Sequence, residues 1–91
     1  MLHILRHSPS STVFDNCLES IDDSSHLLLI EDAVYAVVKL EPRLAELKTQ
    51  GRVSVLASDL VARGLNTDNS WQVDYSGFVK LTGLHCPSFT W

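Results

Sequence analysis

Two cysteines, Cys17 and Cys86, are the side chains of this chain that could carry covalent chemistry. A thiol reacts as a thiolate, so a reactive cysteine has to be accessible and at least partly ionised. Cys17 shares one face of an expected helix with Phe14 and Leu18, a pattern that favours packing as a small buried hydrophobe. Cys86 follows the last expected helix, where it is either an accessible reactive thiol or an incidental surface thiol. Cys17 is therefore the candidate catalytic residue, with packing as its competing interpretation.

The histidines of the chain, His3, His7, His26 and His85, raise the question of a metal site. Zinc sites use closely spaced pairs, such as Cys-x-x-Cys or two histidines on one helical face. No such pair occurs in this sequence, so we expect no metal ion. His7 comes at the end of the first expected strand and could donate a hydrogen bond to a bound group. A loop histidine satisfied by the backbone is the preferred interpretation.

Other polar residues that follow strands are explained by helix capping. Glu31 and Asp32 are adjacent carboxylates, but adjacent side chains diverge, and Asp32 can cap a helix. Ser58 follows a strand and begins a helix, so capping accounts for it too. The sequence contains no Gly-x-Gly-x-x-Gly, P-loop or Gly-x-Ser-x-Gly segment. We therefore expect no cofactor.

The composition indicates one small domain, residues 1–91, that gains stability from partners. A chain of this length buries only roughly 60–65% of its extended-chain surface. Its 45% apolar and 20% charged content is apolar for a small monomer, so we expect apolar surface to be buried between chains. The isolated chain is accordingly expected to self-associate or to be poorly stable. A net charge of −4, with seven scattered Lys and Arg residues, argues against direct nucleic-acid binding.

The cysteine count and the apolar runs favour a reducing cytoplasm as the compartment. Two cysteines do not make a disulfide framework. The apolar segment Leu2–Leu5 is followed by Arg6 and is too short for a signal peptide. No apolar run approaches the roughly 18 residues that a membrane-spanning helix needs.

Short apolar runs alternate with helical patterns along the chain. The runs expected to form strands are Leu2–Leu5, Leu27–Ile30, Val53–Leu56 and Trp71–Val73. Such alternation favours right-handed crossovers and helices on both faces of the sheet. The expected fold class is α/β: a mostly parallel four-stranded sheet in a three-layer α/β/α, Rossmann- or flavodoxin-like arrangement. Sites in such folds lie at the carboxyl ends of the strands, which here are His7–Ser11, Glu31–Asp32, Ala57–Asp59 and Asp74–Ser76.

Capping residues, a proline and a glycine set the expected helix ends. The residues expected to begin helices are Ser10, Ser11 or Thr12, then Asp32, Ser58, and finally Asp74 or Ser76. Pro42 either interrupts the helix that follows Asp32 or opens a second helix at its first position. Gly51 is expected to end that piece.

The segment Phe89-Thr90-Trp91 places two large rings where most chains are frayed and polar. Burying a Trp contributes on the order of 2–3 kcal/mol, enough to hold a tail in place. The tail either docks on its own chain or, with Trp71 and Tyr75, contributes to an interface between subunits.

Several segments are similar to the TusB/DsrH family of sulfur-relay subunits. They are the opening Met-Leu-His, the strand that turns at Glu-Asp, Leu-Ala-Ser-Asp-Leu-Val-Ala-Arg-Gly, Val-Asp-Tyr-Ser-Gly-Phe-Val-Lys-Leu-Thr, and the terminal Trp. The third and fourth segments are the most specific. Together the segments extend over nearly the whole chain.

The resemblance implies a heterohexamer with two copies each of three related small subunits. The sister subunits would be TusC-like and TusD-like, or DsrF-like and DsrE-like. The Tus branch passes persulfide sulfur, through sulfur-carrier proteins, toward 2-thiolation of the wobble uridine of certain tRNAs. The Dsr branch handles sulfur during intracellular sulfur oxidation. In both, the main sulfur-accepting cysteine belongs to a sister subunit.

Three interpretations stay open at this point. The chain is an accessory subunit that completes a sulfurtransferase complex, or it is DsrH-like and Cys17 carries a persulfide. The third is a free-standing α/β domain that binds a small ligand at its strand ends. Whether the chain itself takes part in catalysis is open, and Cys17 and Cys86 leave the branch unassigned.

Overall fold

The computed structural model of the chain describes residues 1–38, 42–84 and 87–91. The elements follow one another as β1 (Leu2–Leu5), α1 (Thr12–Ser20), β2 (His26–Leu29), the 3₁₀ helix η1 (Glu31–Val37), α2 (Pro42–Thr49), β3 (Val53–Leu56), α3 (Ala57–Ala62), the 3₁₀ helix η2 (Asn69–Trp71), β4 (Gln72–Val73), α4 (Tyr75–Leu84) and β5 (Ser88–Thr90). Cys86 and His85 lie outside the described residues.

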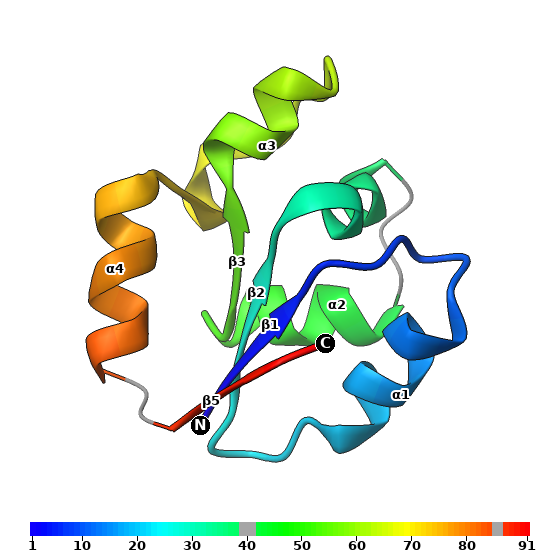
Figure 1. Cartoon of the computed structure of the whole chain (residues 1–91), viewed down its shortest axis with the longest axis vertical. Coiled ribbons are helices and arrows are strands. Elements are labelled where there is room, and N and C mark those ends of the chain that lie inside the picture. The colour runs from blue at the N-terminus through cyan, green and yellow to red at the C-terminus, as the bar shows by residue number, and fades with distance from the viewer. Residues whose placement is uncertain (39–41, 85–86) are drawn as a thin grey trace.

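The strands form one sheet in the order β4-β3-β2-β1-β5, and every neighbouring pair is parallel (Figure 1). The predicted α/β class and parallel sheet are therefore confirmed. The predicted strand number of four is wrong, because the C-terminal segment adds a fifth strand beside β1. Three residues carry too little apolar pattern to predict a strand, so backbone pairing with β1 decides this element.

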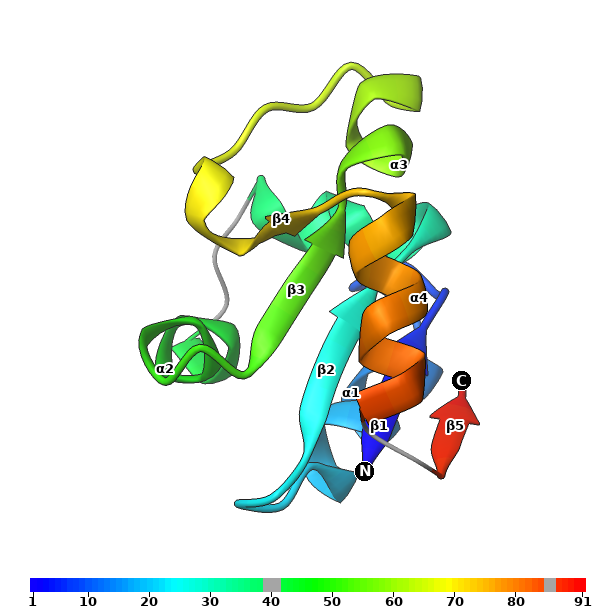
Figure 2. The ribbon, with the colours of Figure 1, turned by 90° about the vertical axis from the view of Figure 1, so that its left-hand side faces the viewer.

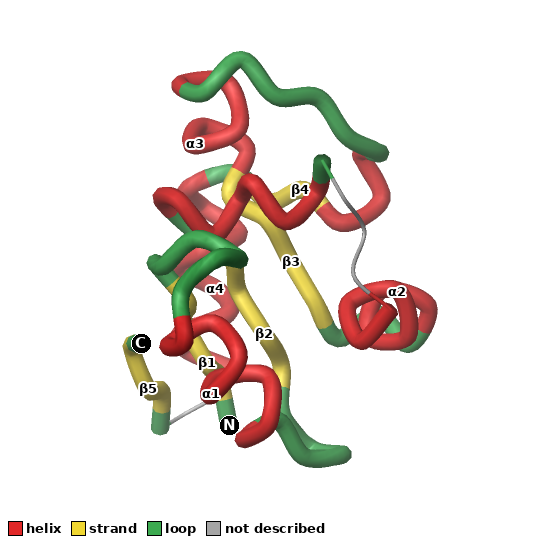
Figure 3. The backbone as a smooth tube through the Cα atoms, turned by 90° about the vertical axis from the view of Figure 1, so that its right-hand side faces the viewer, coloured by secondary structure: helices red, strands yellow, loops and turns green. Residues whose placement is uncertain are grey.

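Helices cover both faces of the sheet, as predicted. Figure 2 shows α4 in front of one face, and Figure 3 shows α1 and α2 on the other. The alternation of side chains along β1 divides the core accordingly. Leu5 belongs to the larger cluster, which includes Phe14 of α1 and Leu44 of α2. Leu2 and Ile4 belong to the smaller cluster, which packs against Phe78 of α4.

Local capping explains where two of the helices begin. The hydroxyl of Ser11 accepts a hydrogen bond from the backbone N–H of Val13 at 3.1 Å, so Ser11 is the cap of α1 among the three predicted candidates. The carboxylate of Asp74 accepts one from the N–H of Gly77 at 2.7 Å at the start of α4. Within the described residues, no helix is both long and apolar enough to cross a bilayer.

The middle of the chain corrects one predicted cap and decides one alternative. Pro42 opens α2 at its first position, and Gly51, with φ of 68°, follows the helix end. The predicted cap at Ser58 is wrong, since α3 already begins at Ala57 and no side chain caps it. The strand β3 runs directly into α3, which leaves no residue between them for a cap.

Candidate functional site at the carboxyl edge of the sheet

The carboxyl ends of β2 and β3 bring η1 and α3 together, at the edge where the sequence predicts a site. Asp59 of α3 accepts a hydrogen bond from the backbone N–H of Glu31, with 2.6 Å between Oδ2 and N. Glu31 has a φ of 49°, a left-handed conformation that is unfavourable for a residue with a Cβ. The Asp59 carboxylate therefore holds a strained residue at the start of η1.

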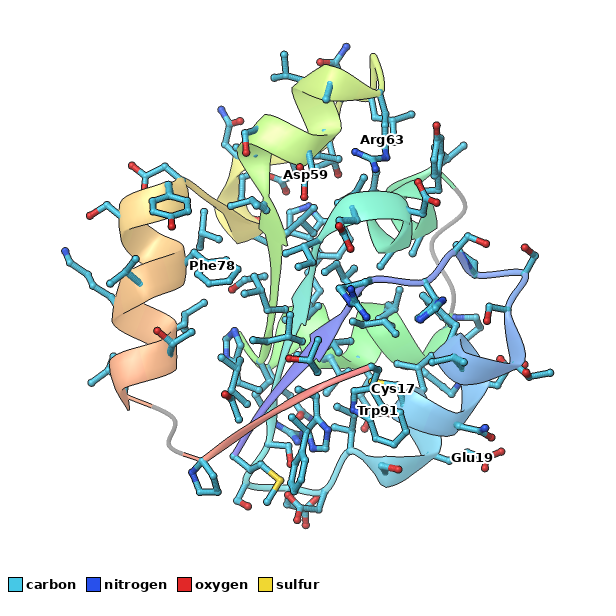
Figure 4. The ribbon with its side chains drawn as sticks, in the orientation of Figure 1. Cys17, Glu19, Asp59, Arg63, Phe78 and Trp91 are labelled. Carbon is cyan, nitrogen blue, oxygen red and sulfur yellow. The ribbon has the colours of Figure 1, made fainter. Side chains whose placement is uncertain are left out.

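A second contact between η1 and α3 is an ion pair. Arg63 Nη2 and Nε lie 3.1 and 3.2 Å from Oδ1 of Asp32. The same guanidinium donates through Nη1 to the backbone oxygen of Asp59 at 3.4 Å. Figure 4 shows Asp59 on α3 and Arg63, the residue that follows this helix. The predicted cap at Asp32 is wrong, because this residue lies in the first turn of η1, after Glu31.

We name these residues, with Arg6, the edge cluster: Arg6, Glu31, Asp32, Asp59 and Arg63. Arg6 closes it from the end of β1, with Nε 3.9 Å from Oε2 of Glu31. Each of its two guanidiniums pairs with one carboxylate, the third carboxylate bonds to the backbone, and no thiol belongs to the cluster. The arrangement joins the ends of β1, β2 and β3 and is suited to fixing the shape of this edge.

The candidate catalytic residue Cys17 lies elsewhere, inside the larger core. Its side chain is fully buried in the cluster that contains Phe14 and Leu27. In Figure 4, Cys17 and Trp91 lie between α1 and the sheet. Burial raises the pKa of the Cys17 thiol to about 12. At neutral pH the thiolate fraction is then on the order of 10⁻⁵, which favours the packing interpretation.

The two histidines near β1 have opposite surroundings. His7 is exposed in the loop after β1. His3 is buried, and its Nδ1 accepts a hydrogen bond from Nε1 of Trp91 at 3.1 Å. Burial is the main cause that lowers the pKa of His3. Sequence patterns missed this pair, because the two residues are 88 positions apart; the only hint was an aromatic residue in the tail.

A partly buried polar pair lies on the opposite face of the sheet. His26 Nε2 and the hydroxyl of Ser54 are 2.9 Å apart. The register pairs His26 with Leu2, and Ser54 with Leu28, so both polar side chains lie on the face that α4 covers. The contact satisfies two polar groups of neighbouring strands and fixes their alignment.

A hollow of about 190 Å³ lies between the end of α1, the following turn and α2. Its lining includes Ile21, Asp23 and Glu46, together with Arg52. Arg52 already donates to the backbone oxygens of Ser25 and Asp22 and to the side chain of Gln50. In the part of the chain that the structure describes, no three His, Cys, Asp or Glu side chains are grouped so that they could hold a metal ion.

Comparison with known proteins places these features in a family. The family model described as "DsrH like protein" matches residues 7–87. Protein TusB of Escherichia coli O81 (strain ED1a) is 36% identical over 95 aligned positions that span both chains completely. Protein TusB of Shigella boydii serotype 18 shows the same identity and coverage. The chain therefore belongs to the DsrH-like protein family.

Proposed function

We propose that the chain is an accessory subunit of a TusBCD-like sulfurtransferase complex. In the cytoplasm, this complex relays persulfide sulfur toward 2-thiolation of the wobble uridine of tRNA. The chain would join TusC-like and TusD-like sister subunits in a heterohexamer and stabilise the assembly. Sulfur would pass mainly through thiols of those subunits. Membership in the DsrH-like family and full-length similarity to proteins named TusB support this proposal.

The burial of Cys17 is the observation on which the accessory role rests. A sulfur acceptor has to expose a thiolate to its donor, whereas this thiol is enclosed in the core and its pKa is raised to about 12. Carrying a persulfide there would also require space for a second sulfur atom in a packed interior. The DsrH-like alternative, with a persulfide on Cys17, would need α1 to separate from the sheet.

Exposed apolar side chains support a role in assembly. Tyr75, Val79 and Leu84 of α4 are 73%, 53% and 78% exposed, and Phe89 of β5 is 52% exposed. Large apolar and aromatic side chains on a surface are typical of contacts between proteins. The net charge of −4 fits a subunit that meets tRNA only through its partners.

The test is the 2-thiouridine content of tRNA in cells that lack this chain, measured by mass spectrometry of tRNA hydrolysates. Deletion should abolish the thiolated nucleoside, and both the natural chain and Cys17→Ala should restore it. Unchanged thiolation after deletion would contradict the tRNA branch. Failure of a normally assembled Cys17→Ala chain to restore thiolation would contradict the accessory role.

A further inference from the structure

We propose that His3 and Trp91 form a pH-sensitive switch: the neutral His3 ring holds β5 against β1, and protonation of that ring releases the C-terminal strand. This inference concerns the chain itself and does not depend on the proposed function. It rests on three observations: the position of the hydrogen bond between Trp91 and His3, the shortness of β5, and the chemistry of an indole that faces an imidazole.

The strand β5 is short and lies at the edge of the sheet. It has three residues, all of them exposed, and among the described strands it pairs only with β1. Backbone hydrogen bonds at its ends run from Leu2 N to Pro87 O at 3.3 Å, from Trp91 N to Ile4 O at 2.7 Å and from Arg6 N to Trp91 O at 3.2 Å. An edge strand of this length is marginal without side-chain burial, so the docking of Trp91 is decisive.

Trp91 supplies that burial through contacts with His3 and the larger core. Its ring stacks on the His3 ring with 6.1 Å between centroids and 27° between planes. Phe89 lies at the same centroid distance from His3. Trp91 also packs against the core cluster that contains Cys17. His3 is therefore the polar residue that both aromatic side chains of the C-terminal segment, Phe89 and Trp91, contact.

The hydrogen bond requires one protonation state of His3. An indole N–H can only donate, so Nδ1 of His3 has to be unprotonated and its remaining proton lies on Nε2. A protonated imidazole donates from both nitrogens. Two N–H groups would then face each other across 3.1 Å, with a charged ring in the core. Protonation thus converts an attractive contact into a repulsive one.

The groups that face His3 determine the direction of the pH effect. Burial in the docked state is the main cause that lowers its pKa, the Asp22 carboxylate after α1 opposes this, and the Met1 amine adds to it. Two side chains contact the His3 ring from this strand: Phe89 of β5 and Trp91, the residue after it. Neither carries a charge. Release returns the ring to water, where its pKa approaches 6.5. Docking is therefore fully favoured above pH 6.5, weakens as the pH falls from 6.5 to the lower docked pKa, and is constant below that.

The experiment follows the two indole N–H groups of the full chain by NMR from about pH 8 to about pH 5. Trp71 is an internal control, because its Nε1 donates to the hydroxyl of Thr67 at 3.0 Å, an acceptor that does not titrate. The Trp91 indole should lose protection from solvent exchange below pH 6.5, while the Trp71 indole keeps its own. For each unit by which docking lowers the pKa of His3, protection of the Trp91 indole should fall about ten-fold once the ring is protonated.

Variants and the titration of His3 itself make the test specific. His3→Gln keeps an acceptor that does not titrate, so the acid release of Trp91 should disappear; His7→Gln, at an exposed site, should leave it unchanged. In the natural chain, the midpoint of release should coincide with the titration of the His3 ring protons. The proposal is overturned if the Trp91 indole stays protected down to pH 5, or if His3→Gln releases it equally. It is also overturned if the midpoint of release differs from the titration midpoint of His3, or if the Trp71 indole loses protection at the same time.

Discussion

Asp59 holds the backbone of Glu31 in a left-handed conformation, with 2.6 Å between the carboxylate Oδ2 and the amide nitrogen and a φ of 49° at Glu31. The two residues belong to different segments of the family resemblance, and the structure joins them at the edge of the sheet. Arg63 and Asp32 repeat the connection one turn further along. These charged residues therefore have a structural explanation: they fasten η1 to α3.

Strain at Glu31 can be measured by comparing Glu31→Gly with Glu31→Ala. Both variants remove the carboxylate that pairs with Arg6, so their difference isolates the backbone. At a positive φ, glycine should be the more stable of the two by about 1 kcal/mol, whereas in ordinary conformations it is the less stable. Urea unfolding measures the two free energies of unfolding. An alanine variant that is equally or more stable would show that Glu31 is not strained.

Replacing Asp59 should release η1. Asp59→Ala leaves the amide of Glu31 without its carboxylate partner, and we expect a loss of about 1–2 kcal/mol in the free energy of unfolding. Asp59→Asn retains a side-chain oxygen as acceptor and should lose less than half of that. Thermal unfolding of the three proteins provides the comparison. Equal losses in both variants would mean that the charge, and not the hydrogen bond, matters.

The fold was predictable wherever one local pattern sufficed. The strands β1 and β3 have the predicted bounds, Leu2–Leu5 and Val53–Leu56, because each is a continuous run of buried residues. The packing interpretation of Cys17 followed from its helical stripe. The pairing of β5 with β1 joins residues 86 positions apart, the contact between His3 and Trp91 joins residues 88 positions apart, and no local pattern carries that information. The contact of η1 with α3 was not predictable either, because it also joins residues that are far apart in the sequence.

Acid stability should depend on Asp22. Hydrogen bonds from Ser25 and from Ser24 lower the pKa of this carboxylate to about 2. A lowered carboxylate pKa stabilises the folded chain above the unfolded value of 3.8, and this contribution is lost as the pH falls from there to about 2.

Unfolding free energies measured across that interval provide the test. Asp22→Asn should flatten the pH dependence, whereas Asp23→Asn, which removes the same charge at the neighbouring position, should keep it. An unchanged slope in Asp22→Asn would show that the turn after α1 contributes nothing to acid stability.

Cys17 should be inert in the folded chain. In a Cys86→Ser background, a soluble disulfide reagent reaches only Cys17. Because the thiol is buried and its pKa is about 12, labelling should be slow at neutral pH and become complete only in denaturant. Labelling of the folded chain as fast as that of the unfolded chain would show that α1 opens readily.

The most direct test of the accessory role is the intact mass of each subunit in the complex reassembled from this chain and its two sister subunits, after incubation with a persulfide donor. The account predicts a gain of one sulfur, about 32 Da, on a sister subunit and none on this chain, and the same result with Cys17→Ala. A sulfur adduct on this chain that disappears with Cys17→Ala would contradict it.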